Sequence, residues 1–411
     1  MSRLPVRTSS EVIGYTQKLI SYEQGSTNNR LLLSGKQTHR QIGNISDSHY
    51  FCEQLYNDYV LPFWNGEKYC LYDTGYELPD SASCYISDEN LFSEIDRGYN
   101  IIFERSHGNE DKWMLVDTES AVGNYTVQHG AGQANTKGTV IVTSACITNA
   151  FARIGEMFNT DPCLSESLLR NSNGGALAYF GSSSFGFVHP TSNNLYYSDL
   201  INAHFFSNLY VPKTDESEYC FGAVATSAKT DFIEEVATDA IYRWLMFSIN
   251  SMGDPEMQVY TDTPKKFSRL VSQFPATYIK PEILVGTNSI MVSSTAPGCR
   301  IVISDENNQR YVFNNTSIAQ LANIPSGTYS VSITKHNYAP IIELSPRLEM
   351  AVLLDRYYFK QLALVPILSM FLLSLMRRST TMSAIFQKVT YTTGHYVSSV
   401  LLQDKLYYQK M

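Results

Sequence analysis

Two stretches decide the fold, Tyr99-Asn-Ile-Ile-Phe-Glu-Arg-Ser-His-Gly108 and Thr139-Val-Ile-Val-Thr-Ser-Ala-Cys146. Each contains a short, continuous apolar run, which is typical of a strand buried on both faces of a parallel sheet. The first run leads to His107 and the second to Cys146, and both side chains can carry chemistry. Because groups just past the carboxyl ends of such strands face the ligand crevice of an open α/β sheet, we expect these two side chains to meet there.

Helix and strand patterns alternate on both sides of these two stretches. The predicted strands are 30–34, 69–72, 100–104, 139–143 and 176–180, and the predicted helices are 9–22, 50–59, 90–96, 164–170 and 202–210. An apolar stripe from Ile233 to Leu245 predicts one further helix, which we expect to close the domain before Gly253. The alternation predicts an α/β fold, with a largely parallel sheet flanked by helices on both faces.

The pattern of apolar and polar residues changes twice after this region. Short alternating runs from about residue 278 predict a small antiparallel β-sandwich, and we divide the chain into domains at 1–265, 278–343 and 350–411. The apolar run 362–376 is shorter than the roughly 18–20 residues that span a bilayer, so we expect no membrane span there. The last segment is predicted as a tail of uncertain fold, and an altered reading frame near the end of the gene is a second explanation.

The amino-acid composition indicates which classes of binding partner to expect. The net charge of −8 and the pI of about 5.5 give no broad basic surface, which argues against nucleic acid and favours peptide or protein partners. Seven cysteines stand singly, without the paired spacing of a zinc or redox motif, so we expect most to be buried apolar residues and at least one to be a free thiol. The other seven histidines show no metal-ligand spacing either. The first ten residues lack the apolar core of a signal peptide.

The pair His107 and Cys146 fits covalent catalysis. A thiol with a pKa of about 8.5 is mostly protonated at neutral pH, and a neighbouring imidazole can remove that proton to give a nucleophilic thiolate. Gly108 lacks a Cβ, so its backbone N–H can approach a reacting carbonyl, and with the Cys146 N–H it is a candidate oxyanion donor. Taken singly, a histidine after a strand is more often a loop residue, and a cysteine after an apolar run is more often a core residue.

The sequence around these strand ends resembles the gingipain family of cysteine peptidases. That family shares with caspases an apolar block before His-Gly and another before Ala-Cys, as found here at His107-Gly108 and Ala145-Cys146. Three more segments resemble the family in the same order, residues 161–170, 174–183 and the Gly-Asp-Pro turn in 250–256. The resemblance implies a caspase-like α/β domain followed by an immunoglobulin-like β-sandwich. It also implies a cysteine endopeptidase with Cys146 as nucleophile and His107 as acid and base.

Further expectations come from the resemblance alone. It implies protein or peptide substrates, a secreted or cell-surface location, no cofactor for the chemistry, and a structural calcium ion. The first residues resemble a point inside the family's catalytic region, so we expect an upstream subdomain, a secretion signal and the acid that orients the imidazole to be missing from this sequence. Glu104 and Asp117 lie near His107 in the sequence, and we interpret both as solvated charges rather than as that acid.

Two other functions remain as alternatives. One is a non-catalytic binding or adhesion protein that keeps the peptidase fold. The other, a cytoplasmic hydrolase unrelated to proteolysis, would need a different nucleophile motif, and the sequence contains none that we recognise. Selectivity for Arg or Lys would need a carboxylate in the substrate pocket, and the sequence does not identify one among its 39 acidic residues.

Overall fold

The computed structural model describes most of the chain up to residue 344 and four short segments after it. The described residues are 2–73, 84–117, 122–152, 160–267, 270–273, 289–305, 307–322, 329–344, 390–392, 395–397, 399–402 and 405–408. They belong to two compact units, one formed by 1–275 with 284–348 and the other by 276–283 with 349–411. Each unit is described below by itself.

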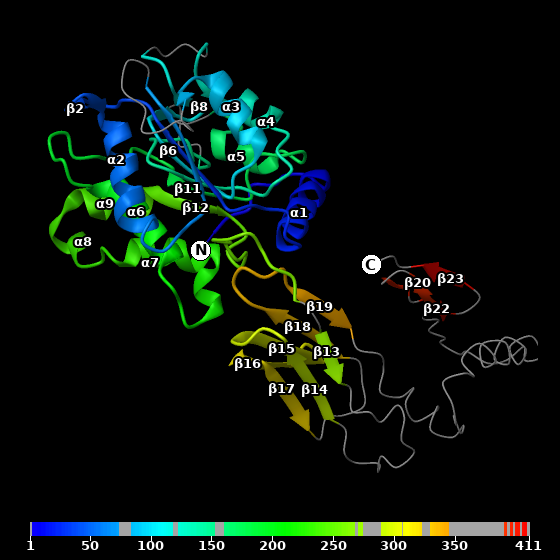
Figure 1. The fold of residues 1–411 in the computed structure, drawn as a ribbon. Coiled ribbons are helices and arrows are strands. Elements are labelled where there is room, and N and C mark those ends of the chain that lie inside the picture. Colours follow the sequence, from blue (N-terminus) through cyan, green and yellow to red (C-terminus); the bar gives the residue numbers. More distant parts are fainter. Residues whose placement is uncertain are drawn as a thin grey trace, which may run out of the picture. The chain divides into compact units, whose positions relative to one another are not determined.

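A seven-stranded sheet forms the centre of the first unit (Figure 1). Its order is β12-β11-β10-β6-β1-β4-β5. The strands are β1 (Arg30–Gly35), β4 (Glu67–Tyr72), β5 (Cys84–Tyr85), β6 (Ile101–Arg105), β10 (Val140–Thr143), β11 (Ala178–Ser182) and β12 (Ile249–Gly253). Only β12 pairs antiparallel within this sheet, so the predicted largely parallel sheet is confirmed.

Helices cover both faces of this sheet, as the alternation predicted. In β6, Ile101 and Phe103 point into one core, whereas Ile102 points into the other, and the neighbouring strands alternate in the same way. The first core is closed by α2 (Asp47–Leu55), α6 (Tyr197–Tyr210), α7 (Phe221–Thr230) and α9 (Ala240–Ser248). The second is closed by α1 (Ser9–Glu23), α3 (Asp88–Arg97), α4 (Val127–Gly132) and α5 (Leu164–Arg170). The central strands are therefore fully covered, which explains their continuous apolar runs.

The predicted last helix of this region was wrong in its extent. The structure divides the stripe into α8 (Glu235–Thr238) and α9, with a break at Asp239. The Asp239 side chain accepts a hydrogen bond from the backbone N–H of Ile241 at 2.7 Å, which makes it the N-cap of α9. Ile233 and Trp244 are 63% and 45% exposed, whereas Leu245 is fully buried, so the apolar stripe is buried only in part. The sheet ends with β12 instead, which the sequence reading missed.

Short elements surround the main sheet. The small strands are β2 (Gln41–Ile42), β3 (Ile45–Ser46), β7 (His107–Asn109), β8 (Lys112–Met114) and β9 (Tyr125–Thr126), and two single turns are η1 (Tyr56–Val60) and η2 (Glu216–Tyr219). Strands β7, β8 and β9 form an antiparallel sheet directly after β6. His107 therefore belongs to an ordered hairpin rather than to a free loop.

Two small antiparallel sheets follow within the first unit. One has the order β13-β14-β17 and the other β16-β15-β18-β19. Their bounds are β13 (Leu270–Gln273), β14 (Ser289–Ser294), β15 (Cys299–Asp305), β16 (Arg310–Thr316), β17 (Ile318–Ala322), β18 (Tyr329–Thr334) and β19 (Ile341–Leu344). Val292 and Ala319 from the first sheet share a core with Ile301 and Ile333 from the second, which confirms the predicted β-sandwich. The exact domain boundaries stay predictions.

The second unit contains two antiparallel strand pairs among its described residues. β20 (Thr390–Thr392) pairs with β21 (His395–Val397), and β22 (Ser399–Leu402) pairs with β23 (Lys405–Tyr408). The apolar run 362–376 and the rest of 345–389 lie outside the described residues. Across the described parts of the chain, no helix has the length and apolar character needed to cross a membrane.

Candidate active site

The sheet register brings the two candidate catalytic segments to the same edge. β6 and β10 are parallel neighbours, and Glu104 lies opposite Thr143 at their carboxyl ends. His107 and Cys146 each follow this aligned pair by three residues. The Ser144 N–H donates to the Glu104 carbonyl at 3.0 Å and extends the pairing one step further. The predicted convergence of the two strand ends is thus a direct result of the topology.

The backbone of Gly108 lies directly against the backbone of Cys146. A Cβ placed on Gly108 would come within 2.6 Å of the Cys146 carbonyl oxygen, 2.8 Å of Thr148 Cγ2 and 2.9 Å of Ala145 Cβ. A side chain at this position would therefore displace the segment that carries the thiol. Glycine is needed here because two chain segments pass each other in contact.

The Cys146 thiol is half-buried and contacts a loop that follows β11. Its Sγ accepts a hydrogen bond from the Gly186 N–H at 3.2 Å. Burial raises the pKa of the Cys146 thiol above its usual value, and the Gly186 N–H acts in the opposite direction. In the described structure no hydrogen bond joins the Cys146 sulfur to the His107 ring. The thiol is therefore a neutral group in this arrangement.

The backbone directly after the thiol is strained. Ile147 has a φ of 64°, a left-handed conformation that is a true outlier for a β-branched residue. Its N–H donates to the Ser184 carbonyl at 2.9 Å, which holds the turn in place. This turn keeps Cys146 at the end of β10 and prevents the chain from continuing as a strand. Strain of this kind is frequent at functional sites.

The His107 ring is exposed and is held by a backbone carbonyl. Its Nε2 lies 2.8 Å from the carbonyl oxygen of Thr38, in the loop after β1. A carbonyl oxygen only accepts hydrogen bonds, so Nε2 must carry the proton. In the neutral ring Nδ1 is then left unprotonated and is the nitrogen that can act as a base. The ring of His39 lies 5.6 Å away, measured between ring centroids.

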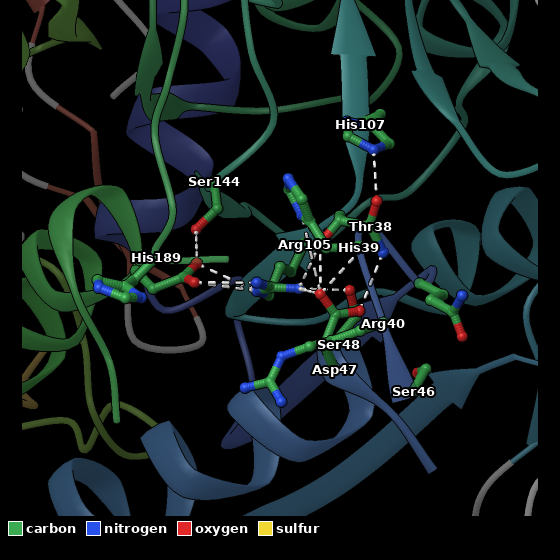
Figure 2. A network of polar contacts seen from close by, with 12 residues as sticks. Thr38, His39, Arg40, Ser46, Asp47, Ser48, Arg105, His107, Ser144 and His189 are labelled. Atoms are coloured by element: carbon green, nitrogen blue, oxygen red, sulfur yellow. Dashed lines mark hydrogen bonds and ion pairs between the residues drawn. The ribbon is translucent and has the colours of Figure 1, made fainter. Parts of the chain in front are cut away.

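Thr38 is itself held by the carboxylate of Asp47 (Figure 2). The Thr38 N–H donates to Asp47 Oδ1 at 3.0 Å, and the Thr38 hydroxyl donates to Oδ2 at 2.7 Å. Burial opposes the charge of Asp47, but Arg105 and the hydrogen bonds from Thr38 and His39 lower the pKa of this carboxyl below its usual value. A buried carboxylate therefore fixes the carbonyl that holds the imidazole.

Neither acidic residue near His107 in the sequence orients its ring. Glu104 is fully buried in the sheet and accepts a hydrogen bond from the Thr143 hydroxyl at 2.7 Å, so its interpretation as a solvated charge was wrong. Burial raises the pKa of Glu104 to about 7, against the effect of the Ser106 and Thr143 hydroxyls. The side chain of Asp117 is 88% exposed and lies 3.6 Å from Lys36, which confirms that it is a solvated charge.

Several residues around this site were not predicted from the sequence. Thr38 acts through its backbone carbonyl, which leaves no signature in the sequence. Asp47 follows Ser46, the N-cap of α2, so in the sequence it reads as an ordinary first-turn acid. The one sequence signal for this polar network was Arg105, because an arginine at the end of an apolar strand needs buried partners.

The structure also bears on the predicted state of the cysteines and on possible metal ligands. None of the seven cysteines, all of which lie in the described residues, forms a disulfide; Cys84 and Cys146 are half-buried and the other five are buried, as expected for small core residues. Over the residues that the structure describes, no group of three or more His, Cys, Asp or Glu side chains could hold a metal ion. The calcium ion implied by the resemblance stays an expectation, and no step below uses a metal.

The sequence profile of a family described as Peptidase family C25 matches residues 1–260. A search of the curated proteins finds no match.

The solved structures that are similar to this chain include three with TM-scores of 0.58 to 0.60. The crystal structure of the Arg-specific cysteine proteinase gingipain R (RgpB) is 15% identical, with a TM-score of 0.60 over 82% of this chain and 73% of that chain. A complex of Porphyromonas gingivalis RgpB pro- and mature domains is 14% identical, with a TM-score of 0.60 over 82% and 74%. A structure described only as a protease is 17% identical, with a TM-score of 0.58 over 84% and 73%. At these identities the likeness shows the fold alone.

Proposed function

Because the chain belongs to peptidase family C25, the gingipain family of cysteine peptidases, we propose that it is an endopeptidase that hydrolyses peptide bonds in protein substrates. Cys146 is the nucleophile and His107 the acid and base. The observation that carries this proposal is the contact between Gly108 and the Cys146 backbone at the ends of two neighbouring parallel strands. It brings a thiol, an imidazole and two backbone N–H groups to one edge of the sheet.

The proposed reaction has two steps. In the first, His107 Nδ1 takes the thiol proton, Cys146 Sγ bonds to the peptide carbonyl carbon, and the N–H groups of Gly108 and Cys146 hold the oxyanion. The C–N bond then breaks, and His107 gives the proton to the leaving amine. In the second step, His107 takes a proton from water, the hydroxyl adds to the thioester carbonyl, and the thiol leaves with the proton. These steps use only the side chains, the backbone and water.

The hydrogen bond between His107 Nε2 and the Thr38 carbonyl supports this assignment of roles. It leaves Nδ1 as the basic nitrogen and stabilises the imidazolium that forms when the thiol ionises. This backbone carbonyl takes the place of the orienting acid, which we expected to be missing from this sequence. By family, the substrates are proteins or peptides, and we infer a secreted or cell-surface location in bacteria.

One observation favours the alternative of a non-catalytic binding or adhesion protein. Burial raises the pKa of Cys146, and the sulfur contacts Gly186 instead of the His107 ring. Catalysis therefore needs a movement that brings the ring and the thiol together when substrate binds, as many unliganded active sites require.

A proteolysis assay with the full-length protein distinguishes a peptidase from a non-catalytic binding protein. The purified protein is incubated with an unfolded protein substrate, and new peptide termini are identified by mass spectrometry. We expect cleavage by the unmodified protein and by Cys84→Ser, which changes the other half-buried cysteine, and none by Cys146→Ala. Cleavage that persists in Cys146→Ala, or its absence from the folded unmodified protein, would reject the proposed reaction.

A further inference from the structure

Arg105 is the last residue of β6 and lies between Thr38, which contacts His107, and Ser144, which precedes Cys146 by two residues (Figure 2). Its side chain is only 1% exposed, and it reaches Thr38 and Asp47 on one side and Asp199 on the other. We propose that Arg105 is a positioning residue that fixes the two catalytic segments relative to each other. This inference rests on the proposed function, because it concerns the same two side chains.

One arm of the network leads from Arg105 to the imidazole. Arg105 Nη1 donates to the Thr38 hydroxyl at 3.1 Å and lies 3.5 Å from Asp47 Oδ2. The Asp47 carboxylate in turn accepts from both the N–H and the hydroxyl of Thr38. Thr38 is thus held at three polar atoms, counting the carbonyl that contacts His107 Nε2 at 2.8 Å. Any shift of the guanidinium is transmitted to this carbonyl.

The other arm leads from Arg105 to the thiol segment. Arg105 Nε and Nη2 both donate to the Asp199 carboxylate, at 3.1 Å and 3.0 Å for the shortest contact of each. Asp199 Oδ1 accepts a hydrogen bond from the Ser144 hydroxyl at 2.7 Å. The amide of Asn202 donates to the same hydroxyl at 2.9 Å. Ser144 precedes Cys146 by two residues, so α6 fixes the end of β10 through this contact.

The set of contacts made at position 105 requires the guanidinium group of an arginine. A guanidinium presents five N–H groups in a planar fork, and here the fork contacts two carboxylates and two hydroxyls, the second being that of Ser48 at 2.7 Å. Burial disfavours the charge, but Asp199 and Asp47 raise the pKa of Arg105 above its usual value. A lysine ammonium is a single point and cannot bond both sides at these distances. The single guanidinium therefore pairs with both buried carboxylates at once.

The test uses full-length variants that loosen each arm separately. Thr38→Val removes the hydroxyl of the His107 arm, Ser144→Ala removes that of the Cys146 arm, and Arg105→Lys keeps the charge but loses the fork. Arg170→Lys is the matched control, because Arg170 is also largely buried and bonds a buried carboxylate, Glu166, at 2.6 Å. Circular dichroism first establishes that each variant is folded.

Two readouts then separate positioning from general support of the fold. For a protein substrate of the unmodified enzyme, we expect kcat to fall about tenfold to a hundredfold in the three variants, with KM within about twofold. Nitrogen-15 NMR of the histidine rings reports the His107 Nε2 proton directly, and we expect Thr38→Val and Arg105→Lys to weaken or shift its signal. Arg170→Lys should change neither readout.

The outcomes distinguish this inference from the proposed function. If the folded variants keep both kcat and the His107 signal, Arg105 is not a positioning residue, even though the protein is a peptidase. If the unmodified protein cleaves nothing but Thr38→Val still loses the His107 signal, the positioning holds and the proposed function fails. If Arg105→Lys does not fold, Thr38→Val and Ser144→Ala decide the question by the same two readouts.

Discussion

Replacing Gly108 with alanine tests the contact on which the proposed site depends. The new Cβ would lie 2.6 Å from the Cys146 carbonyl oxygen, whereas ordinary van der Waals contact begins at 3.4 Å, so the two segments must separate by about 0.8 Å. Two further neighbours, Thr148 and Ala145, lie below 3.0 Å and block a sideways shift. Overpacking of this kind costs about 1–3 kcal/mol of folding free energy. A displacement near 1 Å in a catalytic group can cost about a hundredfold in rate.

We therefore expect Gly108→Ala to unfold at lower urea concentration and to lose about a hundredfold in kcat/KM. Gly132→Ala is the matched control, because its Cβ would meet nothing closer than 3.7 Å, at the ring of Phe92. That change should leave stability unchanged or raise it by about 0.4–1 kcal/mol, and activity should stay the same. If Gly108→Ala is as stable and as active as Gly132→Ala, the inferred contact between the two segments does not exist.

Two more predictions concern a buried acid and the class of substrate. Burial raises the pKa of Glu104 to about 7, so the folded state binds this proton more tightly than the unfolded state, and the stability that it contributes is lost as pH rises from about 4.5 to 7. Urea unfolding should show Glu104→Gln to be about 1–3 kcal/mol more stable than the unmodified protein at pH 8 and nearly equal to it at pH 4.5. The control variant Asp117→Asn, at an exposed position, should show no such difference between the two pH values. If Glu104→Gln and the unmodified protein give the same unfolding curve at pH 8, the buried acid does not destabilise the fold as we infer. A peptide library should show cleavage next to apolar or aromatic residues. Phe185 and Phe187 flank the Gly186 amide that contacts the proposed nucleophile, and their side chains are 46% and 38% exposed. The buried carboxylates nearby already pair with Arg105, so they do not offer a partner to a basic substrate side chain. A preference for Arg or Lys would refute this reading of the site.

The sequence predicted the sheet well because burial dominates there. The runs that became β6 and β10 are covered on both faces, so almost every residue in them is apolar and the pattern is unambiguous. Their parallel direction was then expected from the alternation with helices. The contact of Gly108 with the Cys146 backbone needed no more than this topology.

Predictions failed where one polar residue or a long-range contact decided the local structure. Asp239 ends one helix and caps the next, although the apolar stripe continues across it. Glu104 was read as exposed because a carboxylate is rarely buried, yet a hydroxyl on the neighbouring strand and a raised pKa allow it here. Arg105 and Asp199 are 94 residues apart, and single-sequence patterns carry no information on such pairs. The carbonyl of Thr38 is beyond prediction from sequence, since every residue has one.

The central claim is that His107 activates Cys146, and selective alkylation tests it most directly. The folded full-length protein is treated at pH 6 with a limiting amount of a peptidyl chloromethyl ketone, which occupies the site as a substrate does, and mass spectrometry identifies which of the seven cysteines has reacted. An ordinary thiol is well under roughly 1% ionised at this pH. We predict that Cys146 reacts faster than Cys84, the other half-buried cysteine, and that His107→Ala removes this advantage. If Cys146 reacts no faster than Cys84, or keeps its advantage in His107→Ala, the two residues do not work as a catalytic pair.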